Sequence, residues 1–119
     1  KTASSNRKVP LCGKSLWAAE RILLSESSSK YAFERYNQQS STSANSASAA
    51  LNKWLKSYLP AGCSIHSFRH SMRDRLRSVG CPSDMIDQIG GWSKETVGQG
   101  YGLGFGLETL SSYMDQITI

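Results

Sequence analysis

Residues 66–80, HSFRHSMRDRLRSVG, hold the side chains whose types and spacing are best suited to chemistry. The stretch contains two histidines and four arginines among fifteen residues. In a helix, at about 100° per residue, His66, Arg69, Arg73 and Arg77 fall within about 80° of one another. Arginine keeps its charge and can bind two phosphate oxygens at once, and histidine exchanges protons near neutral pH. The pattern indicates a cationic ridge that could bind phosphate, although a solvated helix face has the same composition.

The same segment also predicts how the ridge is held in place. Its neighbouring face is apolar and is expected to pack in the core through Phe68, Met72, Leu76 and Val79. Arg69 lies at the boundary of the two faces, where its stem can be buried while its guanidinium is aimed outward.

A second, short helix is expected directly after the first. Gly80 ends the first helix, and the second begins at Pro82, carries Met85, Ile86 and Ile89 on its inward face, and closes at residues 90–91, GG. Two helices joined by so tight a turn resemble a helix-turn-helix.

The N-terminal half predicts an extended segment and two helices. Residues 7–11, RKVPL, are expected to form an edge strand because Pro10 cannot donate a hydrogen bond inside a sheet. One helix is expected from Ser15, which can cap it, and another from Asn45 or Ser46 to Pro60. The faces predicted to pack in the core are Leu16, Ala19, Ile22 and Leu23 in the first helix, and Ala50, Leu51, Trp54, Leu55 and Tyr58 in the second.

The C-terminal part predicts a glycine-rich segment followed by a terminal helix. Five glycines between residues 98 and 106 break any regular element around Tyr101 and give a mobile backbone. The helix that follows has an apolar stripe of Leu107, Leu110, Met114 and Ile117. This stripe could pack on its own domain or on a neighbouring copy, and the sequence favours neither.

Composition limits the class of protein. The 119 residues suffice for one domain, and the formal charge of +5 favours a polyanionic partner. No apolar run approaches the roughly 18 residues of a membrane helix. Cys12, Cys63 and Cys81 lack the spacing of a zinc site, so we expect reduced thiols in a cytoplasmic protein. The chain opens on Lys1 and not on Met, and we expect an upstream part to be missing.

Three motifs together resemble the tyrosine recombinases, also called phage integrases. HSFR at residues 66–69, IGGW at residues 89–92 and Tyr101, nine residues after Trp92, are similar to the family's His-x-x-Arg, His-or-Trp and Tyr series. The opening KTASSNRKVPL resembles the family's β-hairpin segment. The resemblance covers residues 1–119 and implies the C-terminal portion of a recombinase catalytic domain. The implied fold is mainly α, a truncated DNA breaking-rejoining fold with a small remnant β-hairpin or edge strand at the N-terminus.

The resemblance implies a role for each motif residue. Arg69 stabilises charge on the scissile phosphate, and His66 donates a hydrogen bond or accepts a proton beside it. Trp92 supports the loop of the nucleophile, and Tyr101 attacks phosphorus to form a 3′-phosphotyrosine intermediate. Lys1 aligns with the hairpin lysine that protonates the departing 5′-hydroxyl. Taken singly, Trp92 is as well suited to a core position, and only the joint spacing supports these roles.

The resemblance also implies partners. We expect double-stranded DNA, site-specific recombination by a bacterial or phage-encoded enzyme, and a tetramer of the full-length protein on DNA. Arg73 and Arg77 are expected to contact the DNA backbone or solvent alone. No cofactor and no metal is implied, because arginines and a lysine take the place of metals.

Two departures from the family pattern matter. The family's first catalytic arginine lies upstream of the hairpin, and Arg7, Arg21 and Arg35 do not fit its place, so the fragment alone is expected to be inactive. Lys1 is terminal, which weakens its assignment.

Other functions remain open. A non-catalytic helix-turn-helix-like DNA-binding module would have the same charge balance, and an interaction domain could use the terminal helix. A type IB topoisomerase has related chemistry, but the short spacing from Arg69 to Tyr101 favours a recombinase.

Overall fold

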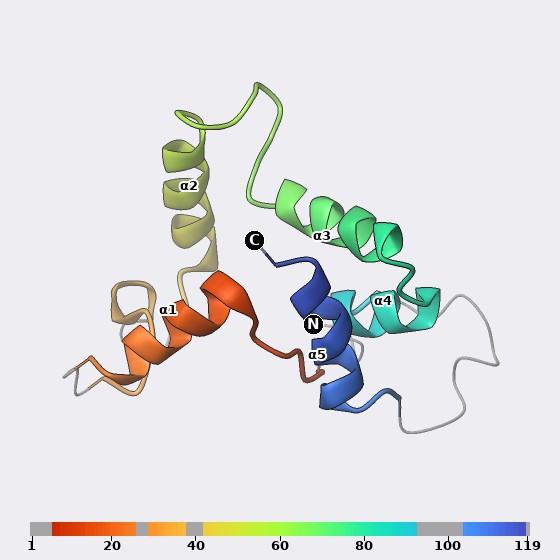
Figure 1. Cartoon of the computed structure of the whole chain (residues 1–119). Helices are drawn as coiled ribbons and strands as arrows, with labels where there is room; N and C mark the ends of the chain where they lie inside the picture. Colours follow the sequence, from red (N-terminus) through yellow and green to blue (C-terminus); the bar gives the residue numbers. More distant parts are fainter. Residues whose placement is uncertain (1–5, 26–28, 38–41, 93–103, 119) are drawn as a thin grey trace.

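The computed structural model describes residues 6–25, 29–37, 42–92 and 104–118 (Figure 1). Its elements in chain order are α1 (Gly13–Leu23), the 3₁₀ turn η2 (Glu34–Tyr36), α2 (Ala44–Leu55), α3 (Ser67–Ser78), α4 (Ser83–Gly90) and α5 (Leu107–Gln116). The predicted mainly α fold is confirmed for these residues. In the same residues, no helix combines the length and apolar character needed to cross a membrane.

The core lies where α3, α4 and α5 meet. Its buried side chains are Leu76, Cys81, Met85, Ile86, Ile89, Leu110 and Ile117. Leu76 is completely buried, and Met72 and Val79 pack against the cluster, so most of the predicted apolar face of α3 is confirmed. Phe68, in the first turn of α3, is half exposed, and its predicted core position is wrong because the core contacts only the later turns of this helix.

Helix α4 matches its prediction closely. Met85, Ile86 and Ile89 are buried, and the helix ends at Gly91, whose φ of 66° and ψ of 37° lie in the left-handed region. Glycine adopts this conformation without steric penalty, which explains the sharp stop.

Helix α5 packs on its own chain. Leu110 and Ile117 lie in the core cluster, and Tyr113 and Met114 pack against it. Of the predicted stripe, Leu107 alone remains about half exposed. In this structure the terminal helix therefore uses its apolar stripe within its own domain.

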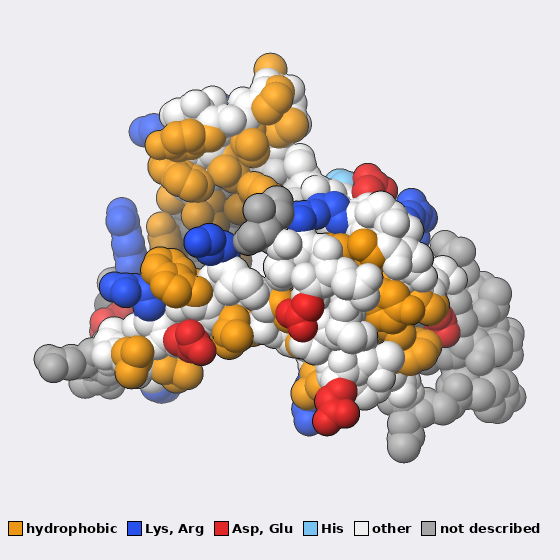
Figure 2. Space-filling view, viewed as in Figure 1, with side chains coloured by type: hydrophobic (Ala, Val, Ile, Leu, Met, Phe, Trp, Pro, Cys, Tyr) orange, Lys and Arg blue, Asp and Glu red, His pale blue; other side chains and the backbone are white. Residues whose placement is uncertain are grey.

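Helices α1 and α2 both form, but α2 ends at Leu55 and not at Pro60, so Tyr58 lies beyond it. The apolar faces of the two helices do not enter the core. α1 has no buried residue, and α2 buries only Leu55. The exposed large side chains of the two predicted faces are Leu16, Leu23, Leu51, Trp54 and Tyr58. The two helices stand away from the α3–α5 core, and hydrophobic side chains gather over α2 (Figures 1 and 2). The Cα radius of gyration is 16.4 Å, against about 13.5 Å for a compact domain of this length.

The N-terminal segment is not a strand. Residues 7–11 carry no strand assignment, so the predicted edge strand is wrong for the described residues. Pro10 cannot donate to a ladder, and the segment packs on helices instead: Val9 contacts the core cluster and the Arg7 Nε donates a hydrogen bond to the Ile89 carbonyl at 2.9 Å.

Helix α1 begins two residues before its predicted cap. Cys12 is the N-cap residue, and Ser15 lies in the first turn. The Ser15 hydroxyl accepts a hydrogen bond from the Cys12 amide at 3.1 Å and donates one to the Cys12 carbonyl at 2.7 Å. Ser15 thus stabilises the helix start from inside the helix, as the third residue of a capping arrangement does.

Candidate phosphate-binding site

The centre of the candidate site is Trp92, at the end of α4. The Trp92 amide donates a hydrogen bond to the Asp87 carbonyl at 3.1 Å, which is the closure expected after a left-handed Gly91. A Cβ placed on Gly90 would lie 1.6 Å from the Trp92 ring. The indole therefore lies directly on the backbone of the helix end, in space that only a glycine leaves free.

Two arginines of α3 lie over this indole. The Cζ of Arg69 is 4.2 Å from the Trp92 ring centroid, and the Cζ of Arg73 is 4.9 Å from it. Both distances are within the range in which a guanidinium is attracted to the face of an indole. The structure thus brings together two predicted site residues, Arg69 and Trp92, that are far apart in the sequence.

The predicted cationic ridge is divided into two parts. Arg73 pairs with Asp87 of α4, with 3.7 Å between Nη2 and Oδ1, and their side chains are 30% and 9% exposed. Arg77 pairs with Asp74 of its own helix at 3.7 Å, and these side chains are 60% and 75% exposed. Arg73 therefore faces the interior of the α3–α4 pair, whereas Arg77 is a surface residue.

His66 lies at the start of α3, one turn before Arg69. It is exposed, and its ring centroid is 5.1 Å from that of His70 in an edge-to-face arrangement. Its carbonyl accepts a hydrogen bond from the Arg69 amide at 3.0 Å. The imidazole is therefore exposed to solvent and lies against the ring of His70, one helical turn before Arg69.

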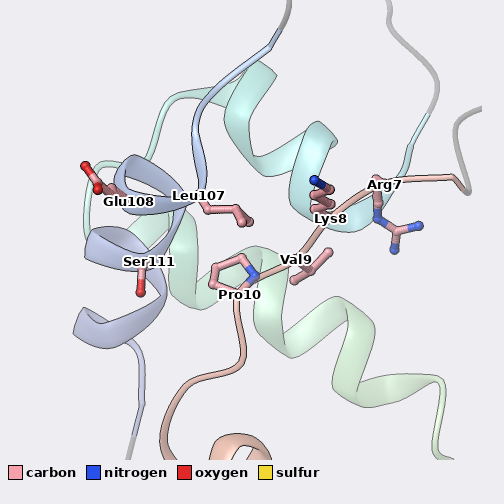
Figure 3. Close-up of a pocket in the computed structure, with 7 residues that line it drawn as sticks. All are labelled: Arg7, Lys8, Val9, Pro10, Leu107, Glu108 and Ser111. Carbon is pink, nitrogen blue, oxygen red and sulfur yellow. The ribbon is translucent and has the colours of Figure 1, made fainter.

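Sequence reasoning missed Arg7 as part of this region. The Nε of Arg7 donates a hydrogen bond to the Ile89 carbonyl. Its guanidinium also lies against Gly91, because a Cβ added to Gly91 would be only 2.4 Å from the Arg7 Nη1. Figure 3 shows the Arg7 guanidinium on the side of the segment away from α5, while Pro10 faces Leu107. No signal in RKVPL distinguishes Arg7 from its basic neighbour.

A second missed residue is Gln88, which attaches the end of the glycine-rich segment, at Phe105, to α4. Its Nε2 donates a hydrogen bond to the Phe105 carbonyl at 2.9 Å, and its Oε1 accepts one from the Phe105 amide at 2.8 Å. Phe105 also packs against the core. α4 therefore holds the chain on both sides of the segment that contains the predicted nucleophile.

Two predicted site residues, Tyr101 and Lys1, lie outside the described residues. Of the other predicted residues, the structure joins Arg69, Arg73 and Trp92, places His66 one helical turn away, and leaves Arg77 on the surface.

The two buried thiols, Cys12 and Cys81, are poorly suited to chemistry at neutral pH. Burial, followed by the nearby Asp115, raises the pKa of Cys12, and burial together with Asp84 raises the pKa of Cys81. Within the described ranges no group of three or more histidine, cysteine, aspartate or glutamate side chains could hold a metal ion.

Comparisons with protein-family models, curated proteins and solved structures found no match to this chain.

Proposed function

We propose that this chain is the C-terminal portion of the catalytic domain of a site-specific tyrosine recombinase. Such an enzyme cleaves and rejoins DNA strands through a covalent 3′-phosphotyrosine. The proposal joins the order and spacing of the motif residues to the arrangement of α3 and α4.

One observation carries the proposal. The Arg69 guanidinium lies 4.2 Å from the centroid of the Trp92 ring, so the arginine of HSFR and the tryptophan of IGGW meet in space. Trp92 itself packs against the core cluster, which fixes the indole beside α3, where Arg69 lies over it. Stacking on the ring leaves the edge of the guanidinium, with its N–H donors, available for an anion, and no described acidic side chain pairs with Arg69.

The proposed reaction has two balanced steps. The Tyr101 oxygen attacks phosphorus, its proton passes to a base such as His66, and the bond from phosphorus to the 5′ oxygen breaks. The departing oxygen takes a proton from Lys1 and becomes a free 5′-hydroxyl. In the reverse direction a 5′-hydroxyl attacks the phosphotyrosine and restores the diester, so no external energy source is needed.

Arg69 contributes by stabilising charge. Negative charge builds on the non-bridging oxygens as the nucleophile approaches, and a fixed guanidinium stabilises that charge more strongly than water does. Removal of one such group commonly costs about 10²–10³ in rate. We expect Arg69→Ala to lose that much of the cleavage rate.

Trapping of the covalent intermediate tests the proposal. The full-length gene product that contains this chain is incubated with a pool of nicked duplexes that together cover the genome encoding it. Cleavage close to a nick releases a short fragment that diffuses away, so the cleaved strand cannot be rejoined. We expect a protein–DNA adduct that survives denaturation, is absent from Tyr101→Phe, and persists in Tyr58→Phe, which changes an exposed tyrosine in the turn after α2.

The same experiment separates the rival functions. Salt-sensitive duplex binding without any adduct would support a non-catalytic DNA-binding module. Absence of both the adduct and salt-sensitive binding would support a protein-interaction domain.

A further inference from the structure

We infer that Asp87 and Arg73 form a positioning pair that fixes Trp92 and, through Trp92, the guanidinium of Arg69. The role of Arg69 toward phosphate rests on the proposed function, whereas the positioning of the indole does not. The inference assigns to Arg73 a task different from the DNA contact that its place on the ridge predicts.

The starting point is an unfavourable pair of charges. Arg69 and Arg73 are four residues apart on α3, and like charges at this spacing repel each other by about 0.2–0.5 kcal/mol. Here both guanidiniums also lie within 5 Å of the centroid of one ring, so two like charges share one indole. Something must offset this repulsion for Arg69 to stay on the indole.

Asp87 is suited to that task. Asp87 is buried, unlike every other charged residue that the structure describes, and its carboxylate lies 3.7 Å from the Nη2 of Arg73. A buried carboxylate without a cation would be strongly unfavourable, so Asp87 and Arg73 need each other. The carboxylate holds the guanidinium of Arg73 toward α4 and partly offsets its positive charge. Arg69 has no acidic partner among the described residues, so its N–H groups stay available for an anion.

Asp87 also holds the indole through its main chain. Its carbonyl accepts the hydrogen bond of the Trp92 amide at 3.1 Å. Asp87 thus fixes the backbone of Trp92 directly after α4. Through its ion pair with Arg73, it also fixes one of the two guanidiniums that lie over the ring. If Asp87 moved, the indole of Trp92 would move with it, and the guanidinium of Arg69 that lies over the indole would be displaced.

Arg73 is poorly placed to bind DNA. Its side chain is 30% exposed, half the exposure of Arg77, and its Nε is buried with no hydrogen-bond partner among the described residues. With its Nε buried and its Nη2 facing the carboxylate of Asp87, the guanidinium of Arg73 is directed toward α4 and not toward solvent. We therefore assign Arg73 to positioning and leave Arg77 as the exposed cation of the ridge.

The chain supplies its own matched control. Arg77 and Asp74 form an ion pair of the same length, 3.7 Å, but on the surface. Arg77→Gln and Asp74→Asn change the net charge as Arg73→Gln and Asp87→Asn do, without touching Trp92. Any effect of charge alone appears in both sets of variants.

The test combines three measurements on full-length protein. In a background in which Trp17, Trp54 and every tryptophan outside residues 1–119 are replaced by Phe, the emission of Trp92 reports the environment of the indole. Anisotropy with a 30-base-pair duplex gives the dependence of binding on salt, and trapping on the nicked substrate gives the cleavage rate. Circular dichroism confirms that each variant is folded.

We expect Asp87→Asn to shift Trp92 emission to longer wavelength, because the ring becomes wetter, and to lower the adduct rate by about 10–100-fold, as small displacements of catalytic groups do. This direction is diagnostic, since the loss of a negative charge by itself would strengthen binding to DNA. Arg73→Gln should give the same shift and leave the salt slope unchanged, and Arg73→Lys should restore part of the adduct rate. Asp74→Asn and Arg77→Gln should leave the emission unchanged.

Two results would overturn the inference. The first is unchanged Trp92 emission in both Asp87→Asn and Arg73→Gln. The second is a salt slope lowered by about one unit in Arg73→Gln, which indicates a lost phosphate contact. If no variant and no wild-type protein forms an adduct, the proposed function fails, while the emission and salt measurements still decide the role of the pair.

Discussion

The two halves of the molecule differ in what their apolar faces contact. In the C-terminal half, α3, α4 and α5 share a cluster of seven buried residues around Leu76. In the N-terminal half, α1 and η2 bury no residue and α2 buries only Leu55. Both halves contain amphipathic helices. Hydrophobic periodicity therefore identifies the helix face that needs a packing partner, but it does not identify the element that packs against it.

The difference also locates the candidate site. Arg69 and Arg73 lie on α3, and Trp92 directly follows α4, the helix against which α3 packs. A phosphate-binding group must be held in a fixed place to be effective, and packed helices provide that support. The exposed helices α1 and α2 contribute none of the described residues of the site.

The largest expected effect comes from truncation in the packed half. Leu76→Ala removes a fully buried side chain and should lower the free energy of unfolding by about 2–5 kcal/mol. Leu51→Ala, on the exposed face of α2, should lower it by less than about 1 kcal/mol. Urea unfolding followed by circular dichroism measures both. Equal losses would show that the two halves are equally packed and would remove the contrast.

An intermediate loss of stability is expected at Gly90, the last residue of α4, on which the Trp92 ring lies. Gly90→Ala places a Cβ 1.6 Å from the Trp92 ring, which must move away. We expect a loss of about 1–3 kcal/mol in unfolding free energy, together with a change in Trp92 emission. Gly106→Ala, where an added Cβ meets nothing within 4 Å, is the control and should cost less than about 1 kcal/mol. A stable Gly90→Ala protein with unchanged emission would contradict the placement of Trp92.

The smallest effect concerns reactivity and not stability. Cys63 is exposed, whereas Cys12 and Cys81 are buried. Burial raises the pKa of the two buried thiols, so they remain protonated above the pH at which an ordinary thiol ionises, and the reactive thiolate forms only at higher pH. Mass spectrometry after brief alkylation at pH 8 should find Cys63 modified first. Faster labelling of Cys81 would mean that the packed half opens readily.

The sequence predicted the elements better than their contacts. α4 could be predicted almost completely, because Pro82, the inward isoleucines and the two closing glycines all indicate one short buried helix. The exposed faces of α1 and α2 could not, because the pattern of an unpartnered amphipathic helix is the same as that of a packed one. The strand at residues 7–11 was wrong for a related reason, since no described residues form a strand with which RKVPL could pair.

The candidate site was predictable in its residue types and not in its pairings. Motif spacing selected Arg69 and Trp92, whose contact the structure describes. Helical periodicity placed Arg73 beside Arg77 on one ridge, but it could not show that Asp87, from the next helix, pairs with Arg73. Contacts of this kind depend on how two helices cross, and one helix's sequence does not contain that information.

The most direct test of the central claim is peptide mapping of the DNA-linked protein. After trapping on a nicked duplex, protease digestion and mass spectrometry identify the residue that carries the nucleotide. The account predicts a phosphodiester on Tyr101, formed at a rate that falls steeply in Arg69→Ala and little in Arg77→Ala. A nucleotide attached to any other residue, or an adduct formed equally well without Arg69, would contradict it.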